Sequence, residues 1–217
     1  CGDVQQIPGR PHDHQPILDA IAGRDVVAIV ATHGHNDHIN AADALAAAVD
    51  APILLHPDDA ELWGHVYPDR RWDQDLADGD ELRAGGHELR VLHTPGHASN
   101  HACLLLEASG LLFTGDHLMS GSTVVILPPD GSMRLYVESL RRLREMPIAD
   151  LAPGHGALIQ GAHAEIDRVL AGFAEYQLTD DLIVFTHTEV LPAFERQGVG
   201  SALARAALDD VRGSGER

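Results

Sequence analysis

Short apolar runs, separated by clusters of glycine, proline and polar residues, recur along the first 160 residues of the chain. The run at residues 26–31 is rich in β-branched side chains, which predicts a buried strand followed by a polar loop. Residues 89–92 predict another strand, and residues 102–107 and 111–114 predict the two arms of a hairpin. This pattern indicates a sheet-containing domain whose strands end in polar turns.

Helical patterns lie between these strands. Residues 39–49 are rich in alanine, and residues 136–146 alternate leucines with arginines at the spacing of an amphipathic helix. Residues 118–127 predict a loop and a strand. Further on, residues 171–176 and 182–190 predict two more strands. We therefore expect an α/β protein with a second, smaller segment at its end.

Charge and composition narrow the possible partners. The 217 residues carry a formal net charge of −18, which argues against a large basic surface for nucleic acid. Two cysteines, Cys1 and Cys103, are too few for a disulfide framework. The sequence has no secretory signal and no apolar run of about 18 residues, so we expect a cytoplasmic protein that acts on a small molecule, away from membranes. The oligomeric state remains open.

The most informative segment follows the first strand. His33, His35, Asp37 and His38 fall within six residues, in the spacing H-x-H-x-D-H. Loops at the ends of buried strands are where α/β sheets commonly carry functional groups. Imidazole nitrogen and carboxylate oxygen together suit zinc or another first-row metal ion. The alternative is a solvated, histidine-rich loop.

Three later turns repeat this arrangement, each after an apolar run. They read T-P-G-H, T-G-D-H and P-G-H-G, and they contain His97, Asp116 and His155. The glycine before each of these residues permits the tight backbone that a converging side chain requires. Repetition of one pattern at four places favours a metal site over a solvated loop.

These four motifs, in this order, resemble those of the metallo-β-lactamase-fold hydrolases over roughly residues 10–160. The resemblance implies an αββα sandwich that holds two zinc ions, with iron or manganese as alternatives, and a hydroxide between the ions as the nucleophile. It implies that Asp116 bridges the ions and that Asp37 and Asp116 are catalytic. It implies one ion on His33, His35 and His97, and the second on Asp37, His38 and His155.

The chain also departs from this family. Such hydrolases ordinarily begin with several antiparallel strands, so we expect a sandwich that lacks its first strands. His93, His101 and His117 flank the ligand set, and we expect them to be structural or to hydrogen-bond a ligand. His56 is either structural or part of a substrate pocket.

The sequence motifs indicate the metal ligands more specifically than they indicate the substrate. Residues 33–97 resemble hydroxyacylglutathione hydrolases of the glyoxalase II type, whereas residues 97–156 are similar to the β-lactamase-like protein 2 group, which includes endoribonucleases. The acidic charge favours a small thiolester or ester. An endoribonuclease-like enzyme, a lactone or lactam hydrolase, and a metal-binding but inactive protein remain alternatives.

The end of the chain resembles a different family. Residues 195–203 are similar to the glycine-rich loop of GCN5-related N-acetyltransferases, which implies a coenzyme A site at Gln197, Gly198 and Gly200. The position before these residues is Arg196, where the family usually has glycine, and the later strand and helix are missing. We therefore predict a hydrolase domain at residues 1–165 and a partial, ββα acetyltransferase-like segment at residues 166–217. A glycine loop that only caps a helix is the alternative, and we expect coenzyme A to bind weakly or not at all.

Overall fold

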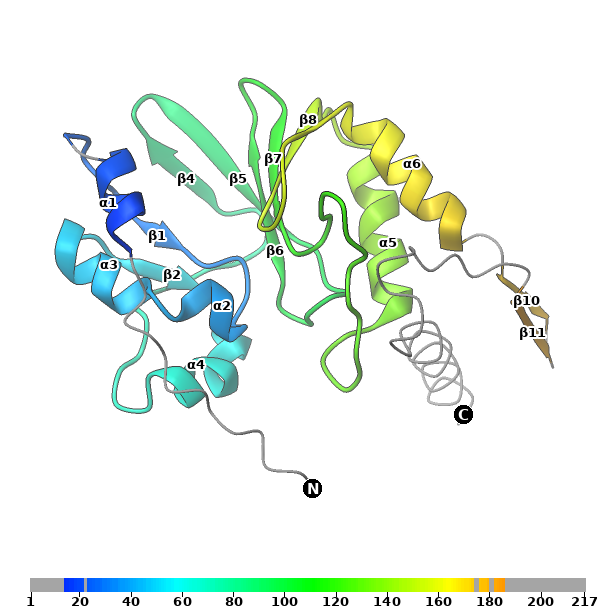
Figure 1. The fold of residues 1–217 in the computed structure, drawn as a ribbon, viewed down its shortest axis with the longest axis horizontal. Coiled ribbons are helices and arrows are strands. Elements are labelled where there is room, and N and C mark those ends of the chain that lie inside the picture. Colours follow the sequence, from blue (N-terminus) through cyan, green and yellow to red (C-terminus); the bar gives the residue numbers. More distant parts are fainter. Residues whose placement is uncertain (1–13, 22, 174–175, 180–181, 186–217) are drawn as a thin grey trace. The chain divides into compact units, whose positions relative to one another are not determined.

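The computed structural model of the chain describes residues 14–21, 23–173, 176–179 and 182–185 (Figure 1). The chain divides into two compact units between Leu76 and Ala77. The division separates the predicted metal ligands into a group of four in the first unit and a group of three in the second. The two units are described in turn.

The first unit contains a three-stranded parallel sheet. Its strands are β1 (Ile29–Val30), β2 (Ile53–Leu55) and β3 (Gln74–Asp75), in that order. Parallel neighbours need crossover connections, which short helices supply between the strands. The helices of this unit are α1 (Gln15–Ile21), α2 (Asn36–Ile39), α3 (Ala42–Val49), the 3-10 helix η1 (Pro57–Asp59) and α4 (Ala60–Val66).

A small aromatic core holds the first unit together. Trp63 of α4 is 2% exposed, and its ring lies 5.9 Å from that of Trp72 and 4.5 Å from that of Tyr67. The Tyr67 hydroxyl donates a hydrogen bond of 2.9 Å to the carbonyl of Ile39, the last residue of α2. Because Ile39 is itself fully buried, α2 is fixed from both its side chain and its backbone.

The second unit contains a six-stranded sheet whose order follows the chain. Every neighbouring pair is antiparallel except β7 and β8, which are parallel and are connected by helix α5 (Met133–Arg144). The hairpin predicted at residues 102–114 is confirmed as β6 and β7. The strands are β4 (Glu81–Ala84), β5 (His87–His93), β6 (Ala102–Leu106), β7 (Leu111–Gly115), β8 (Asp150–Pro153) and β9 (Ile159–Gln160).

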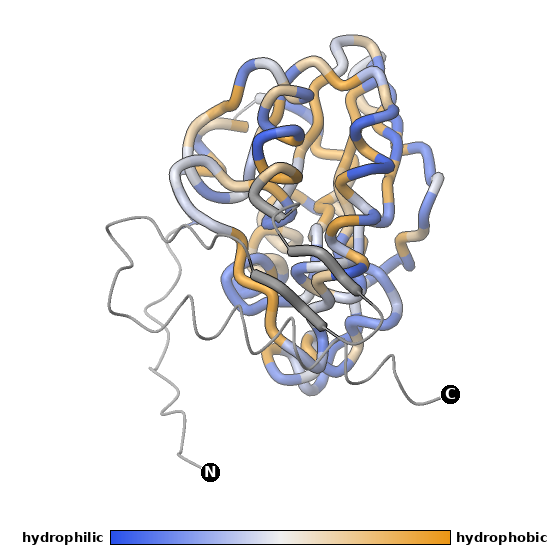
Figure 2. The backbone as a smooth tube through the Cα atoms, turned by 90° about the vertical axis from the view of Figure 1, so that its right-hand side faces the viewer, coloured by the Kyte–Doolittle hydropathy of each residue, from blue (hydrophilic) through white to orange (hydrophobic). Residues whose placement is uncertain are grey.

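Helices α5 and α6 (Ala162–Phe173) pack together in the second unit. Apolar and polar positions alternate along both helices, as expected for helices with one face on a core (Figure 2). Leu140 and Leu143 of α5 and Ile166 of α6 are fully buried in the same cluster as Leu112 of β7. The amphipathic helix predicted at residues 136–146 is therefore confirmed, beginning three residues earlier and ending two residues earlier.

The strand predicted within residues 118–127 was wrong, and so was the start of the strand predicted at residues 171–176, which reaches β-structure only at Tyr176. Residues 118–127 form a loop, although Val124 and Ile126 are buried while Val125 and Leu127 are exposed, as in a strand. The Val125 carbonyl accepts from a histidine ring and the Leu127 carbonyl accepts from Gly131, so neither pairs with a neighbouring strand. Residues 171–173 belong to α6, because its packed face continues through Val169 and Leu170.

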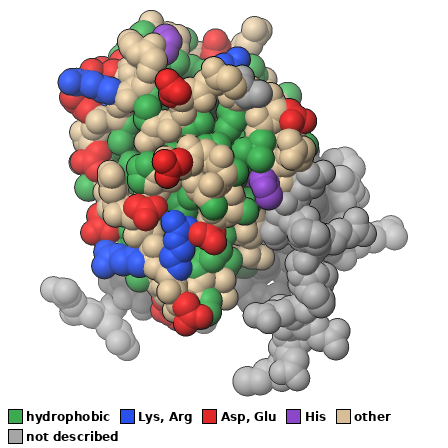
Figure 3. All heavy atoms as spheres, turned by 90° about the vertical axis from the view of Figure 1, so that its left-hand side faces the viewer, with side chains coloured by type: hydrophobic (Ala, Val, Ile, Leu, Met, Phe, Trp, Pro, Cys, Tyr) green, Lys and Arg blue, Asp and Glu red, His purple; other side chains and the backbone are tan. Residues whose placement is uncertain are grey.

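The described part of the tail contains two strands, and residues 186–190 of the second predicted strand lie outside the described residues. β10 (Tyr176–Thr179) and β11 (Leu182–Phe185) form an antiparallel pair. The residues of the predicted coenzyme A loop lie outside the described part of the chain. Among the described helices, none is long and apolar enough to cross a membrane. The face turned to the viewer in Figure 3 carries scattered Asp and Glu side chains with fewer Lys and Arg, in keeping with the net charge of −18.

Candidate metal centre

The first group of predicted ligands lies in the loop between β1 and α2. His33 is fully buried, and the rings of His33 and His35 lie 4.6 Å apart in an edge-to-face arrangement. A ring nitrogen of one lies within 4.8 Å of a ring nitrogen of the other. Thr32 Oγ1 lies 3.1 Å from His33 Nδ1, which makes Nε2 the candidate ligand atom of His33.

Gly34 lets this loop lie close against α4. A Cβ atom at Gly34 would lie 2.9 Å from Cβ of Leu62, closer than real Cβ atoms approach, and a tight 3.0 Å from Cγ of Asp59. Asp59 is 1% exposed, so a buried acidic side chain lies beside the histidine loop. The motif analysis did not include Asp59 among the site residues. Its position beside the histidine loop follows from the packing of η1 and α4 against Gly34, which the sequence motifs do not show.

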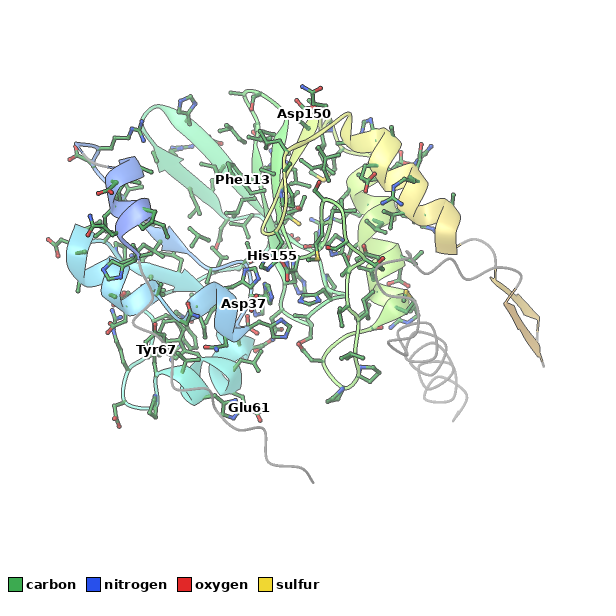
Figure 4. The ribbon with its side chains drawn as sticks, in the orientation of Figure 1. Asp37, Glu61, Tyr67, Phe113, Asp150 and His155 are labelled. Carbon is green, nitrogen blue, oxygen red and sulfur yellow. The ribbon has the colours of Figure 1, made fainter. Side chains whose placement is uncertain are left out.

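Asp37 and His38 occupy the first turn of α2. Asp37 Oδ2 lies 3.6 Å from His38 Nε2, and the ring of His38 lies 4.2 Å from that of His33. The side chain of Asp37, labelled in Figure 4, is 62% exposed, whereas that of His38 is 12% exposed. The structure therefore brings together all four candidates of the first group, with Asp37 at the solvent side.

The second group is arranged around Asp116, in the turn after β7. One carboxylate oxygen, Oδ2, lies 3.7 Å from Nε2 of His97, and the other, Oδ1, lies 3.5 Å from Nε2 of His155. Asp116 is 7% exposed, whereas the side chain of His155, labelled in Figure 4, is 48% exposed. The two oxygens of one buried carboxylate are thus directed toward two different imidazoles.

These distances fit shared metal ions better than direct hydrogen bonds. Hydrogen bonds between nitrogen and oxygen usually measure about 2.7–3.2 Å. Two ligand atoms each about 2.0–2.2 Å from a tetrahedral zinc ion are separated by roughly 3.4 Å. The separations of 3.5 and 3.7 Å around Asp116 are close to that value. The donor set and its spacing therefore suit a divalent metal ion on each side of Asp116.

Backbone contacts orient His97 and His155. His97 Nδ1 donates a hydrogen bond of 2.6 Å to the Val125 carbonyl, which can only accept, so Nε2 is the ligand atom of His97. The Ser120 N–H donates to the carbonyl of His155 at 3.3 Å. Gly96, before His97, has a φ of +154°, and a Cβ there would lie 2.5 Å from Cα of Tyr136. Only glycine permits this turn to lie against α5.

The flanking histidines have different surroundings. His93 Nε2 lies 2.9 Å from the Ser99 carbonyl, which is a structural contact. His101 Nε2 accepts a hydrogen bond of 3.1 Å from the main-chain N–H of Asp116. His117 is fully buried, burial lowers its pKa to about 3, and neither ring nitrogen has a hydrogen-bond partner within the described residues. His56 Nδ1 accepts a hydrogen bond from the Asp58 N–H and caps η1. This contact favours the interpretation of His56 as a structural residue over that of a substrate-pocket residue.

The comparisons with known proteins assign the family. Residues 8–155 match the metallo-beta-lactamase superfamily, and residues 162–217 match the GCN5-related N-acetyl-transferase family. The first match covers more than half of the 217 residues. The chain therefore belongs to the metallo-beta-lactamase superfamily. Both resemblances inferred from the motifs are confirmed, as is the α/β fold of this superfamily.

Proteins of similar sequence include an uncharacterised protein and two named hydrolases. An uncharacterised protein of Aquifex aeolicus is 35% identical over 145 residues, which are 61% of this chain and 69% of that protein. A hydroxyacylglutathione hydrolase of Cereibacter sphaeroides is 35% identical over 143 residues, 64% of this chain and 53% of that enzyme. The atrochrysone carboxyl ACP thioesterase AgnL7 of Paecilomyces divaricatus is 34% identical, over 64% of this chain and 41% of that enzyme. The chain thus spans about half the length of the named hydrolases.

Solved structures agree with the fold. The metallo-beta-lactamase family protein TTHA1429 from Thermus thermophilus has a TM-score of 0.63 at 24% identity, over 76% of this chain and 68% of that one. The protein TTHA1623, determined in a di-iron-bound form, has a TM-score of 0.57 at 29% identity, over 70% of this chain and 81% of that one. The His and Asp clusters of this chain indicate a divalent metal, in line with that fold.

Proposed function

We propose that this chain is a binuclear, metal-dependent hydrolase that cleaves a small thiolester or ester. In this proposal the two groups of ligands form one centre, as the superfamily motifs imply. One zinc-class ion is held by His33, His35 and His97, and the other by Asp37, His38 and His155. Asp116 contributes to both.

The arrangement of Asp116 carries this proposal. Its two oxygens are directed toward imidazoles assigned to different ions, at 3.7 Å from His97 and 3.5 Å from His155. A carboxylate that served one ion, or formed an ordinary ion pair, would not need one histidine on each oxygen. Burial of Asp116 also makes a compensating positive charge necessary, because an isolated buried carboxylate is costly.

The side chains of this centre have different roles in hydrolysis. When bound, the two ions supply a water whose pKa is lowered to about 7 and polarise the carbonyl of the substrate. Asp116 would contribute one carboxylate oxygen to each ion from its buried position. Asp37 is mostly exposed, so its second oxygen can accept a proton or orient the attacking water. We assign no protein nucleophile, since none is needed for this chemistry.

The names of the similar proteins and the charge of the chain favour the substrate class. Two relatives are named as a thioesterase and a hydroxyacylglutathione hydrolase, both of which act on thiolesters. A net charge of −18 disfavours RNA, because phosphate binding depends on clustered Lys and Arg. A small molecule is therefore the preferred substrate, with an endoribonuclease-like or lactone or lactam hydrolase as the competing assignment. Zinc is the preferred metal, and the di-iron form of TTHA1623 makes iron the first alternative.

We also propose that residues 1–165 supply the hydrolase and residues 166–217 a partial acetyltransferase-like segment with little or no affinity for coenzyme A. Helix α6 continues across residue 165, and its Ile166 is fully buried in the core of the second unit. A test of independence should therefore cut after Phe173, which keeps α6 intact. Unchanged metal content and turnover after this cut would support the division, and loss of bound metal would contradict it.

Turnover on a panel of substrates tests the assignment. The zinc-loaded chain should hydrolyse an S-acyl thiolester and an activated ester faster than a β-lactam or a short RNA. Asp116→Ala, purified and loaded in the same way, serves as the matched control for contaminating hydrolases. Faster cleavage of RNA or β-lactam would favour the competing assignment. Bound metal with no turnover on any of these substrates would favour the inactive alternative and contradict the proposal.

A further inference from the structure

His101 lies in a buried chain of hydrogen bonds directly beneath Asp116. The His101 side chain is fully buried, with Nε2 3.1 Å from the main-chain nitrogen of Asp116 and Nδ1 3.0 Å from Oγ1 of Thr94. Thr94 is also fully buried, and its Oγ1 lies 3.2 Å from Sγ of Cys103. Cys103 Sγ in turn lies 3.7 Å from the carbonyl of Thr114, two residues before Asp116.

The Asp116 N–H and the Cys103 thiol together give a consistent direction for the bonds in the chain, with the thiol donating to the Thr114 carbonyl. The main-chain N–H of Asp116 can only donate, so His101 Nε2 must accept and the ring proton must lie on Nδ1. Nδ1–H then donates to Thr94 Oγ1, and the Thr94 hydroxyl donates to Cys103 Sγ. The Cys103 thiol donates to the Thr114 carbonyl, and burial raises its pKa to about 12, so it keeps its proton.

The turn that carries Asp116 is fixed on its other sides as well. Gly115 has a φ of +47°, and its carbonyl accepts from Gly154 N–H at 2.8 Å. The Thr114 carbonyl accepts from His117 N–H at 2.9 Å, and the Thr114 hydroxyl donates to the Leu118 carbonyl at 2.8 Å. With His101 on the Asp116 N–H, the backbone on both sides of the carboxylate is held, and only the two side-chain torsions of Asp116 remain.

We infer that His101 is a positioning residue for the shared carboxylate, held in its neutral Nδ1–H form by the Asp116 N–H at Nε2 and by Thr94 at Nδ1. The inference rests on the proposed metal centre. His101 uses the Nε2 lone pair for the Asp116 N–H and the Nδ1 position for a proton, so it is not an eighth metal ligand. Its effect on the centre passes through the backbone of Asp116 and not through contact with an ion.

Two substitutions separate this role from simple packing. The side-chain oxygen of Gln in His101→Gln can accept from the Asp116 N–H near the position of Nε2, whereas His101→Leu fills similar space without an acceptor and leaves that N–H buried and unsatisfied. We expect His101→Leu to lower the affinity for zinc by about 10- to 100-fold, the range typical of groups that support a metal ligand. We expect His101→Gln to lose much less than this lower bound of about 10-fold, because the acceptor for the Asp116 N–H is retained.

The ring proton itself is measurable without metal. Two-bond ¹H–¹⁵N correlation spectra of the metal-free, ¹⁵N-labelled chain report which ring nitrogen of His101 carries hydrogen. We expect Nδ1–H in wild type and in Thr94→Ser, which retains the hydroxyl, and a weaker preference for this form in Thr94→Val, where only the Asp116 N–H still selects it. Thr94→Val provides a second, smaller perturbation should His101→Leu not fold.

The outcomes distinguish the inference from the function on which it rests. A chain that binds two ions while His101 carries Nε2–H overturns the inference alone. Equal zinc affinities for His101→Leu and His101→Gln also overturn it. A wild-type chain with His101 in the Nδ1–H form but no affinity for zinc overturns the proposed function and, with it, the role of His101 in metal binding.

Discussion

The two groups of candidate metal ligands, the first half in the first unit and the second half in the second unit, are built in different ways. In the first unit, one loop and the first turn of α2 supply His33, His35, Asp37 and His38 within six residues. In the second unit, His97, Asp116 and His155 come from three turns that follow three different strands. The first half is set by the local path of the chain, whereas the second depends on how β5, β7 and β8 are placed in their sheet.

This difference extends to the supporting contacts. The loop of the first unit relies on a close approach, since Gly34 lies against Leu62 and Asp59. The second half relies on hydrogen bonds from distant residues, because Val125 orients His97 and His101 holds the backbone of Asp116. Ligands that come from several turns need such a supporting network. We therefore expect substitutions far from the ligands to weaken metal binding more in the second half than in the first.

Loss of the shared carboxylate should have the largest effect. Asp116→Ala should reduce bound metal from about two ions per chain to one or fewer and lower turnover at least about 100-fold, because ligand loss exceeds the effect of losing a supporting group. His117→Leu is the control, since neither ring nitrogen of His117 is hydrogen-bonded within the described residues. Elemental analysis of both variants checks this prediction. Equal loss of metal in the two would mean that the ligands are misassigned.

The second largest effect should come from adding a methyl group at Gly96, which should lower the free energy of unfolding. Gly96→Ala adds a Cβ 2.5 Å from Cα of Tyr136 at a φ of +154°, so overpacking and backbone strain together should cost about 3 kcal/mol of unfolding free energy. Gly121→Ala is the matched control, because Gly121 also has a positive φ but has open space around it. Urea denaturation of both variants measures the difference. A cost for Gly96→Ala no larger than for Gly121→Ala would show that the close packing on α5 is unimportant.

The corresponding change in the first half should be milder. Gly34→Ala places a Cβ 2.9 Å from Cβ of Leu62 without a positive φ, so we expect about 1–2 kcal/mol of overpacking alone. The same denaturation measurement, with Gly64→Ala as control, tests this, because Gly64 has nothing within 4 Å of an added Cβ. If Gly34→Ala were more destabilising than Gly96→Ala, the first loop would be the more constrained of the two halves.

The sequence was most informative where structure is local. The loop of His33 to His38 and the hairpin of β6 and β7 follow from motif spacing and apolar runs, and the structure contains both. The prediction of a strand within residues 118–127 was wrong, because side chains can alternate between buried and exposed positions without the backbone pairing with another strand. There the carbonyls of Val125 and Leu127 accept hydrogen bonds from a side chain and a turn.

Sequence motifs did not predict contacts between segments that are distant along the chain. The bond from Asp116 N–H to His101 depends on the pairing of β5, β6 and β7, which brings the end of β7 to the start of β6. The buried carboxylate of Asp59 depends on the packing of α4 against Gly34. In both cases the residue type is compatible with a surface position, and only the fold gives it a role.

The number of metal ions per chain tests the central claim most directly. Chain purified without chelator, and metal-free chain titrated with zinc, should each be measured by elemental analysis against protein concentration. The proposed centre, in which Asp116 contributes to both ions, predicts about two zinc-class ions per folded chain, both lost on prolonged dialysis against a strong chelator. A folded chain that retains less than half an ion, and takes up none on titration, would contradict the binuclear centre.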